Sequence, residues 1–198
     1  MSHYFTNDEN LKSEFRKLEY KYQDFSFCFI SDNGIFSKDK IDYGSKLLLE
    51  TFIKNNKSVS NVLDLGCGYG FIGIVLNKVY GCKVDMCDIN SRAVHLTKMN
   101  IKNNKADCNV FESNIYENIV NKYDYIICNP PIRAGKSVVM DMLENAKNYL
   151  NKNGELWFVM KKDHGLKSTL KTLEKQYHLE VIIKSKTFYI IRAKIVDL

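Results

Sequence analysis

The sequence is poor in proline and has no long apolar run. It contains two prolines, Pro130 and Pro131, which are adjacent, and a single tryptophan among 198 residues. No apolar run approaches the roughly 18 residues of a membrane span, and the first residues do not resemble a signal peptide. Internal repeats, low-complexity tracts and linker-like stretches are also absent. We therefore expect a single-domain cytoplasmic protein with no membrane association.

Closely spaced cysteine pairs are absent as well. The six cysteines contain no C-x-x-C pair, and most of them lie in or beside predicted strands. Structural zinc sites and disulfide-stabilised folds rely on such spacing or on an oxidising compartment. We therefore interpret the cysteines as reduced, small apolar residues and expect no metal.

Acidic residues are outnumbered by basic ones. The chain has 29 Lys and Arg against 23 Asp and Glu, which gives a net charge of +6. Such a balance favours an anionic partner, with nucleic acid as the first candidate. Because the lysines are spread over the whole chain, the charge alone favours RNA only slightly.

Apolar strand-like segments alternate with segments of helical periodicity. Strands are predicted at residues 59–64, 82–87, 108–111, 123–128, 155–160, 179–183 and 188–196. Helices are predicted at residues 42–55, 71–79, 91–103 with Ser91 as N-cap, 136–150 and 166–177. This alternation predicts an α/β fold with a mostly parallel, doubly wound sheet. The last two strands are too close in sequence for a crossover helix, so they must be antiparallel.

The N-terminal region has a different pattern. Aromatic and apolar residues nearly alternate from Glu14 to Ser37, which predicts strands, and Ser31–Gly34 is a predicted turn. We predict a small antiparallel β extension in residues 1–37, packed on a main domain of residues 38–198.

Two stretches that follow predicted strands carry the chemistry. Asp-Leu-Gly-Cys-Gly-Tyr-Gly (64–70) lies between a strand and a buried helix. This arrangement is typical of nucleotide-type cofactor sites, because glycines let a ligand approach the backbone. Asn-Pro-Pro-Ile (129–132) follows another strand and places an amide and two rigid prolines at a strand carboxyl end, where α/β sheets bind ligands.

Two classes of cofactor compete for the first stretch. Gly68-x-Gly70-x-x-Gly73 matches the fingerprint of dinucleotide-binding sites. Asp88 lies where that fingerprint has the acidic residue that binds the ribose hydroxyls. However, Asp64 would face a pyrophosphate, Asn-Pro-Pro has no role in hydride transfer, and an antiparallel last strand does not suit a plain dinucleotide domain. S-adenosylmethionine, with its ammonium and sulfonium groups, meets all three objections. We therefore favour it over a nicotinamide cofactor.

These motifs resemble those of the class I "small-domain" (MTS) S-adenosylmethionine-dependent methyltransferases. The similarity covers roughly residues 25–196, including Gly34–Ser37, Asp42–Ser45 and Lys161–Gly165, and residues 129–136 are its most specific part. It implies a Rossmann-like, seven-stranded sheet with an antiparallel last strand. Characterised members methylate the exocyclic N2 of guanine in small-subunit (16S) ribosomal RNA. The resemblance to single-domain members therefore implies ribosomal RNA or the small ribosomal subunit as partner. For the oligomeric state, a monomer and a homodimer both stay open.

Roles for individual residues follow from this resemblance and from their chemistry. The expected catalytic residues are Asn129, Pro130, Pro131 and Ile132, where the Asn129 side-chain oxygen and the Pro130 carbonyl hold the target amine. The expected cofactor residues are Asp64, Gly66, Cys67, Gly68, Gly70, Asp88, Ile89, Asn114, Asn129, Phe36 and Ser37. Asn114 stands where the family usually has Asp. The expected RNA-binding residues are Arg133, Lys136, Lys161 and Lys162.

Other functions stay open at this point. The same chemistry would serve adenine N6 or a protein glutamine, although Ile132 stands where such enzymes have an aromatic residue. A non-catalytic RNA-binding domain with a retained fold is the alternative from another class. The intact glycines, Asp88 and Asn129 argue against it.

Overall fold

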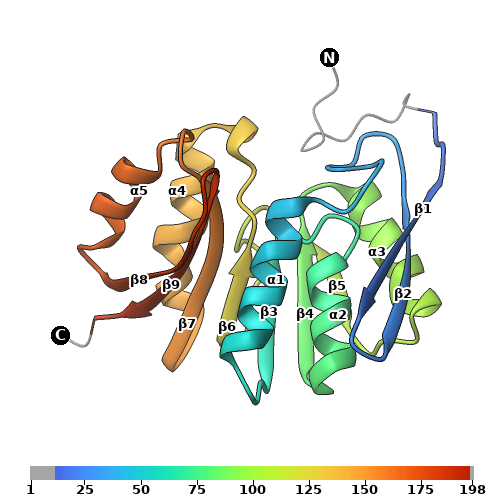
Figure 1. The fold of residues 1–198 in the computed structure, drawn as a ribbon, viewed down its shortest axis with the longest axis horizontal. Coiled ribbons are helices and arrows are strands. Elements are labelled where there is room, and N and C mark those ends of the chain that lie inside the picture. The colour runs from blue at the N-terminus through green and yellow to red at the C-terminus, as the bar shows by residue number, and fades with distance from the viewer. Residues whose placement is uncertain (1–11, 197–198) are drawn as a thin grey trace.

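The computed structural model describes residues 12–196, so the first part of the predicted N-terminal extension lies outside the described residues. Its centre is a seven-stranded sheet with the order β5-β4-β3-β6-β7-β9-β8 (Figure 1). The strands are β3 (Asn61–Leu65), β4 (Lys83–Asp88), β5 (Asn109–Glu112), β6 (Tyr123–Cys128), β7 (Leu150–Lys161), β8 (Tyr177–Lys184) and β9 (Phe188–Ile195). Only β9 runs opposite to the other six strands of this sheet, which confirms the predicted Rossmann-like sheet.

Helices cover both faces of this sheet. One face packs against α1 (Tyr43–Asn55), α2 (Phe71–Tyr80) and α3 (Ser91–Asn103), whose buried side chains include Phe52, Ile74 and Leu96. The other face packs against α4 (Lys136–Glu144) and α5 (Leu166–Leu173), through side chains such as Leu143 and Leu173. Within residues 12–196, no helix is long and apolar enough to cross a membrane. The parallel strands therefore all end at one edge, where connecting loops can form a site.

A separate two-stranded hairpin, β1 (Arg16–Tyr22) and β2 (Phe25–Ser31), packs against α2 and α3 (Figure 1). Its attachment uses Asn100 of α3 and Asn104, the C-cap of this helix. Asn100 and Asn104 each donate to and accept from the backbone of β2, at Ile30 and Cys28 respectively, over 2.7–3.0 Å. Each side-chain amide thereby satisfies the backbone N–H and C=O of one residue at the edge of β2, as a neighbouring strand would. This antiparallel pair agrees with the strands predicted before Ser37.

The start of α3 corrects one sequence prediction. Its N-cap is Asn90 rather than Ser91, because the Asn90 side-chain oxygen accepts the N–H groups of Arg92 and Ala93. The cap therefore lies one residue earlier, directly after the loop that follows β4.

Two predicted helices are shorter than expected. The helix predicted over 136–150 ends at Glu144, and a 3-10 helix, η2 (Asn145–Tyr149), leads straight into β7. The helix predicted over 166–177 ends at Leu173. Both changes involve Tyr177, whose buried hydroxyl donates to the Leu143 carbonyl at 3.0 Å and accepts the Lys147 N–H at 2.8 Å. This long-range contact replaces helical hydrogen bonds and fixes Tyr177 at the start of β8.

Candidate active site

A pocket of about 610 Å3 opens at the carboxyl ends of β3, β4, β5, β6 and β7. Its lining combines segments that are distant in sequence: residues 35–37, 64–69, 87–89, 113–115, 129–134 and 159–161, with Asp42, Ser45, Phe71, Ile72, Ala93, Val138, Met142, His164 and Phe188. Both motifs singled out in the sequence therefore meet in one cavity.

The glycine-rich turn after β3 forms one wall. Gly66 and Gly68 adopt φ angles of 74° and 58°, which L side chains rarely adopt. A Cβ atom on Gly68 would meet nothing within 4 Å, so this backbone is open to a ligand. Gly70 has a different place: it does not line the pocket, and a Cβ there would lie 2.8 Å from the Thr97 methyl group. A glycine is therefore required at position 70, at the start of α2, because any side chain there would clash with Thr97.

Two carboxylates lie beside this turn. Asp64 is 2% exposed and accepts the Gly73 N–H at 2.9 Å, and burial raises its pKa to about 7. Asp88 accepts the Gly68 N–H at 2.8 Å and the Asn90 N–H at 2.9 Å, and burial raises its pKa as well. The Asp88 charge further raises the pKa of Asp64. This wall is therefore suited to a ligand with positive charge near Asp64 and hydroxyl groups near Asp88.

The far end of the same wall is more apolar. Ile89 is 42% exposed and Phe36 is 40% exposed, although both are large hydrophobic residues that line the pocket. Asn114 follows β5 and also faces the cavity. Ser37 lines the pocket with a left-handed φ of 55°. These residues form a site for a flat apolar group with a polar edge.

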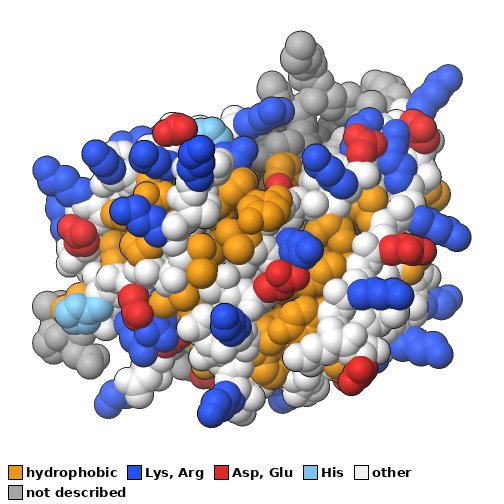
Figure 2. All heavy atoms as spheres, in the orientation of Figure 1, with side chains coloured by type: hydrophobic (Ala, Val, Ile, Leu, Met, Phe, Trp, Pro, Cys, Tyr) orange, Lys and Arg blue, Asp and Glu red, His pale blue; other side chains and the backbone are white. Residues whose placement is uncertain are grey.

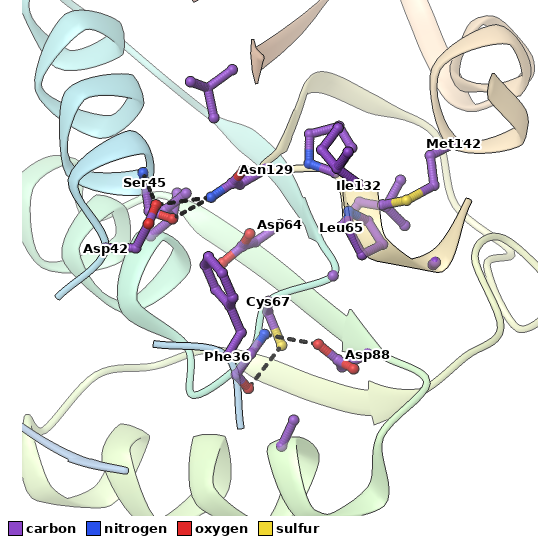
Figure 3. A pocket seen from close by; sticks show the side chains of 18 of the residues that line it. Phe36, Asp42, Ser45, Asp64, Leu65, Cys67, Asp88, Asn129, Ile132 and Met142 are labelled. Atoms are coloured by element: carbon purple, nitrogen blue, oxygen red, sulfur yellow. Dashed lines mark hydrogen bonds between the residues drawn. The ribbon is translucent and has the colours of Figure 1, made fainter. Parts of the chain in front are cut away.

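Asn129 lies at the opposite wall, directly after β6. Its side-chain nitrogen donates to Asp42 Oδ2 at 3.0 Å and to Ser45 Oγ at 2.9 Å, as Figure 3 shows. Because a carboxylate only accepts hydrogen bonds, the group facing Asp42 must be the amide NH2. The side-chain oxygen of Asn129 is therefore turned away from Asp42 and Ser45, as an acceptor for another group.

Asp42 and Ser45 owe their positions to the start of α1. Asp42 is the N-cap of this helix, and its Oδ2 accepts the Ser45 N–H at 2.7 Å. The cap therefore fixes both partners of Asn129. Asp42 and Ser45 have no predicted role in the site, although an Asp followed by Ser at the N-terminus of a predicted helix is a capping signal.

The prolines shape the loop after Asn129. The Pro131 carbonyl accepts the Ala134 N–H at 2.8 Å and starts a short 3-10 helix, η1 (Ile132–Ala134). Pro130 is buried, and Ile132 is half-buried beside the core formed by α4. All three residues line the pocket, as does Arg133. The loop is thus a fixed support for Asn129.

The remaining predicted residues separate into two groups. Cys67 and Lys161 line the pocket, whereas Lys136 and Lys162 are exposed outside its lining. Cys67 is 8% exposed, and burial raises its pKa far above the ordinary thiol value. Among residues 12–196, no cluster of three or more His, Cys, Asp or Glu side chains is arranged to hold a metal ion.

Fold and pocket together define a class of protein. A seven-stranded sheet with one antiparallel strand, a glycine turn after its central strand, an acid after the next strand and Asn-Pro-Pro after β6 are the features of an S-adenosylmethionine-dependent methyltransferase. The family model described as "methyltransferase small domain" matches residues 26–192. The chain belongs to this family.

Individual relatives agree with this assignment. The protein YbxB of Bacillus subtilis (strain 168), described as uncharacterised, is 36% identical over 197 residues, which cover 97% of this chain and 98% of YbxB. A ribosomal RNA small subunit methyltransferase C of Photorhabdus laumondii is 38% identical over 131 residues, which cover 64% of this chain and 38% of that protein. The chain thus spans well under half the length of that named relative.

A solved structure shows the same fold. The 16S rRNA N2 methyltransferase of T. thermophilus, in complex with AdoMet and guanosine, superposes with a TM-score of 0.83 at 22% identity. The match covers 94% of this chain and 52% of that chain.

Proposed function

We propose that the protein is a cytoplasmic N-methyltransferase that transfers a methyl group from S-adenosylmethionine to the exocyclic N2 of a guanine in small-subunit ribosomal RNA. The orientation of Asn129 carries the proposal. Its NH2 group is held by Asp42 and Ser45, so its oxygen can accept a hydrogen bond from a substrate amine. The names of the ribosomal RNA methyltransferase relatives support the substrate class.

The pocket residues fit the proposed cofactor. The open backbone of Gly66 and Gly68 and the carboxylate of Asp64 would hold the methionine part, while Asp88 would accept from the ribose hydroxyls. Ile89, Phe36 and Asn114 would enclose the adenine. Bound there, S-adenosylmethionine would supply an electrophilic methyl group and leave as S-adenosylhomocysteine, while the methylated amine would release one proton to water.

The contribution of the chain to the reaction is positioning. The amino group of guanine is a weak nucleophile, because its lone pair is delocalised into the ring. Its two N–H groups can donate to Asn129 Oδ1 and to the Pro130 carbonyl, which orients the lone pair toward the cofactor side of the pocket. Because the loop is stiffened by two prolines, these acceptors are ordered before the substrate binds.

Basic residues at the rim would bind the phosphate groups of the RNA. Arg133 and Lys161 line the mouth of the pocket, and Lys136 and Lys162 are exposed beside it. Contacts of this kind position a nucleic acid without reading its sequence. The proposed partner is therefore ribosomal RNA or the small subunit, bound by a protein whose active form is a monomer or a homodimer.

A methyl-transfer assay tests the proposal. Small-subunit RNA, both naked and in assembled subunits, is incubated with tritiated S-adenosylmethionine and wild-type protein or the Asn129→Ala variant, and the nucleosides are identified by mass. We expect label in N2-methylguanosine with the wild type and its loss in the variant. Label in N6-methyladenosine would overturn the guanine assignment. Cofactor binding without label in any RNA would overturn the RNA substrate.

A further inference from the structure

An exposed aromatic side chain lies next to the pocket but does not line it. Tyr43 is the first residue of α1, directly after Asp42, and it is 61% exposed. Its ring lies against Phe188 of β9, with 5.5 Å between the centroids and 52° between the planes. Phe188 itself lines the pocket. The two rings therefore form a continuous aromatic surface that leads from the pocket to the outside.

This contact is built into the packing of α1 on the sheet. Gly44 lies between Tyr43 and Ser45, and a Cβ atom added to it would be 3.0 Å from Phe188 Cε1. The missing side chain of Gly44 thus lets Phe188 approach the first turn of α1. Because Tyr43 is mostly exposed, its own ring contributes little buried area to the core, and packing alone does not account for a large aromatic residue there.

Lysine residues lie on one side of the aromatic surface. The Lys161 ammonium group lies 5.3 Å from the centroid of the Phe188 ring. The backbone N–H of Lys162 donates to the Thr187 carbonyl at 2.9 Å, which brings the exposed residues Lys162 and Lys186 to the same rim. Figure 2 shows Lys and Arg side chains gathered over the end of the molecule that carries α5 and the β8–β9 turn, with hydrophobic atoms exposed beside them. Asp163 is an acidic neighbour in the same loop.

We propose that Tyr43 and Phe188 form a stacking platform for the base next to the target nucleotide, with Lys162 binding its phosphate. This inference rests on the proposed function. A base can enter the pocket only after it has left its stack, which deprives its neighbour of a stacking partner. Aromatic side chains flanked by cations are how proteins bind such unstacked bases of single-stranded RNA.

Equilibrium binding of two short RNAs tests the platform. One is a single-stranded oligonucleotide with a central guanosine, and the other has abasic nucleotides around the same guanosine. We expect Tyr43→Ala to weaken binding of the first RNA about tenfold and to leave binding of the second unchanged. Tyr43→Phe, which keeps the ring, should bind both RNAs as the wild type does. Lys162→Ala should weaken both RNAs and lower the salt dependence of binding, because it removes a phosphate contact.

The outcomes separate this inference from the proposed function. S-adenosylmethionine affinity is measured for each variant, to show that the fold is intact. Equal binding of the base-containing RNA by the wild type and Tyr43→Ala would overturn the platform, while methyl transfer to RNA would still support the proposed function. An equal loss for both RNAs would also overturn it, since the flanking bases would then make no contribution to binding. Failure of the wild type to bind or methylate any RNA would overturn the proposed function itself.

Discussion

The two walls of the pocket are built in opposite ways. The wall proposed for the cofactor comes mostly from one stretch of chain, residues 64–114, in which each strand end adds the next group. The wall proposed for the substrate joins four separate segments: the start of α1, the loop after β6, the end of β7 and the start of β9. Local sequence therefore specifies the first wall, whereas the second exists only in the folded chain.

The walls also differ in chemistry. The first wall offers backbone groups and buried carboxylates, which are fixed by hydrogen bonds to neighbouring backbone N–H groups. The second offers one amide whose orientation depends on side chains 84 and 87 residues away in sequence. Substitutions on the first wall should thus change cofactor affinity, and substitutions on the second should change the rate of transfer.

The largest effect is expected at Asn129. Asn129→Ala removes a preorganised acceptor, so kcat should fall about 100- to 1,000-fold. Although Asn129 is also an expected cofactor residue, the Kd of S-adenosylmethionine should change less than about tenfold, because the main cofactor contacts are proposed on the other wall. Steady-state kinetics and calorimetric titration measure the two quantities. Asn129→Asp is the matched control of equal size: it cannot donate to Asp42 and places two carboxylates together, so it should be as slow. A tenfold loss of cofactor affinity in Asn129→Ala would contradict the assignment of cofactor binding and methyl transfer to separate walls.

Asp88 should give the reciprocal result. Asp88→Ala removes the acceptor proposed for the ribose hydroxyls, and hydrogen bonds to a charged group contribute enough for an affinity loss of about 100-fold. At saturating cofactor, kcat should stay near that of the wild type. Asp88→Asn retains one acceptor oxygen, so its cofactor affinity should lie between that of the wild type and that of Asp88→Ala. A fall in kcat with unchanged cofactor Kd would contradict the assignment of Asp88.

A smaller effect is expected at Asp42, because we expect it to act on the reaction through Asn129, whose amide it holds. Asp42→Ala removes both the helix cap and the anchor of the Asn129 amide, whereas Asp42→Ser keeps a capping hydroxyl and removes the carboxylate. Both variants should lower kcat about tenfold, while only the alanine variant should lose about 1 kcal/mol of stability. Steady-state kinetics measures kcat of both variants, and thermal unfolding measures their stability. If kcat falls only in the less stable variant, Asp42 has a purely structural role.

This contrast explains how much the sequence could predict. The glycine turn and Asp88 follow strands at short range, and Asn129 follows another strand, so strand-end reasoning brings all of them to one edge. Trp157, in the middle of β7, and four of the six cysteines are buried. Ser91, by contrast, is a suitable N-cap by residue type, but the side-chain oxygen of Asn90 accepts the Arg92 and Ala93 N–H groups and caps the helix instead.

The features that the sequence could not predict depend on contacts between segments that are distant in the chain. The Tyr177 hydroxyl shortens α4, and no local periodicity could reveal that contact. The position of β9 between β7 and β8 brings Phe188 to the pocket, and this pairing does not follow from the order of strands in the sequence. Likewise, the helix predicted over residues 42–55 does not reveal that Asp42 caps this helix and accepts a hydrogen bond from Asn129.

The smallest expected effect is the response of the cofactor wall to pH. Asp64 has a pKa of about 7 in the free protein, because burial disfavours its charged form and Asp88 adds to this. A bound cation stabilises the carboxylate and lowers this pKa, so binding releases a proton below pH 7. Affinity for S-adenosylmethionine should therefore increase from pH 6 to pH 8, by at most about tenfold per pH unit below the pKa.

Asp64→Asn provides the control for this response. The variant carries no charge at position 64, so it should bind the cofactor more weakly at pH 8 and lose most of the dependence on pH. Calorimetry in buffers with different ionisation enthalpies would detect the released proton directly in the wild type. Equal slopes in the wild type and Asp64→Asn would place the titrating group elsewhere, with Asp88 as the next candidate because its pKa is also raised. In that case the cationic part of the ligand would lie closer to Asp88 than to Asp64, which would contradict the proposed placement of the methionine part beside Asp64.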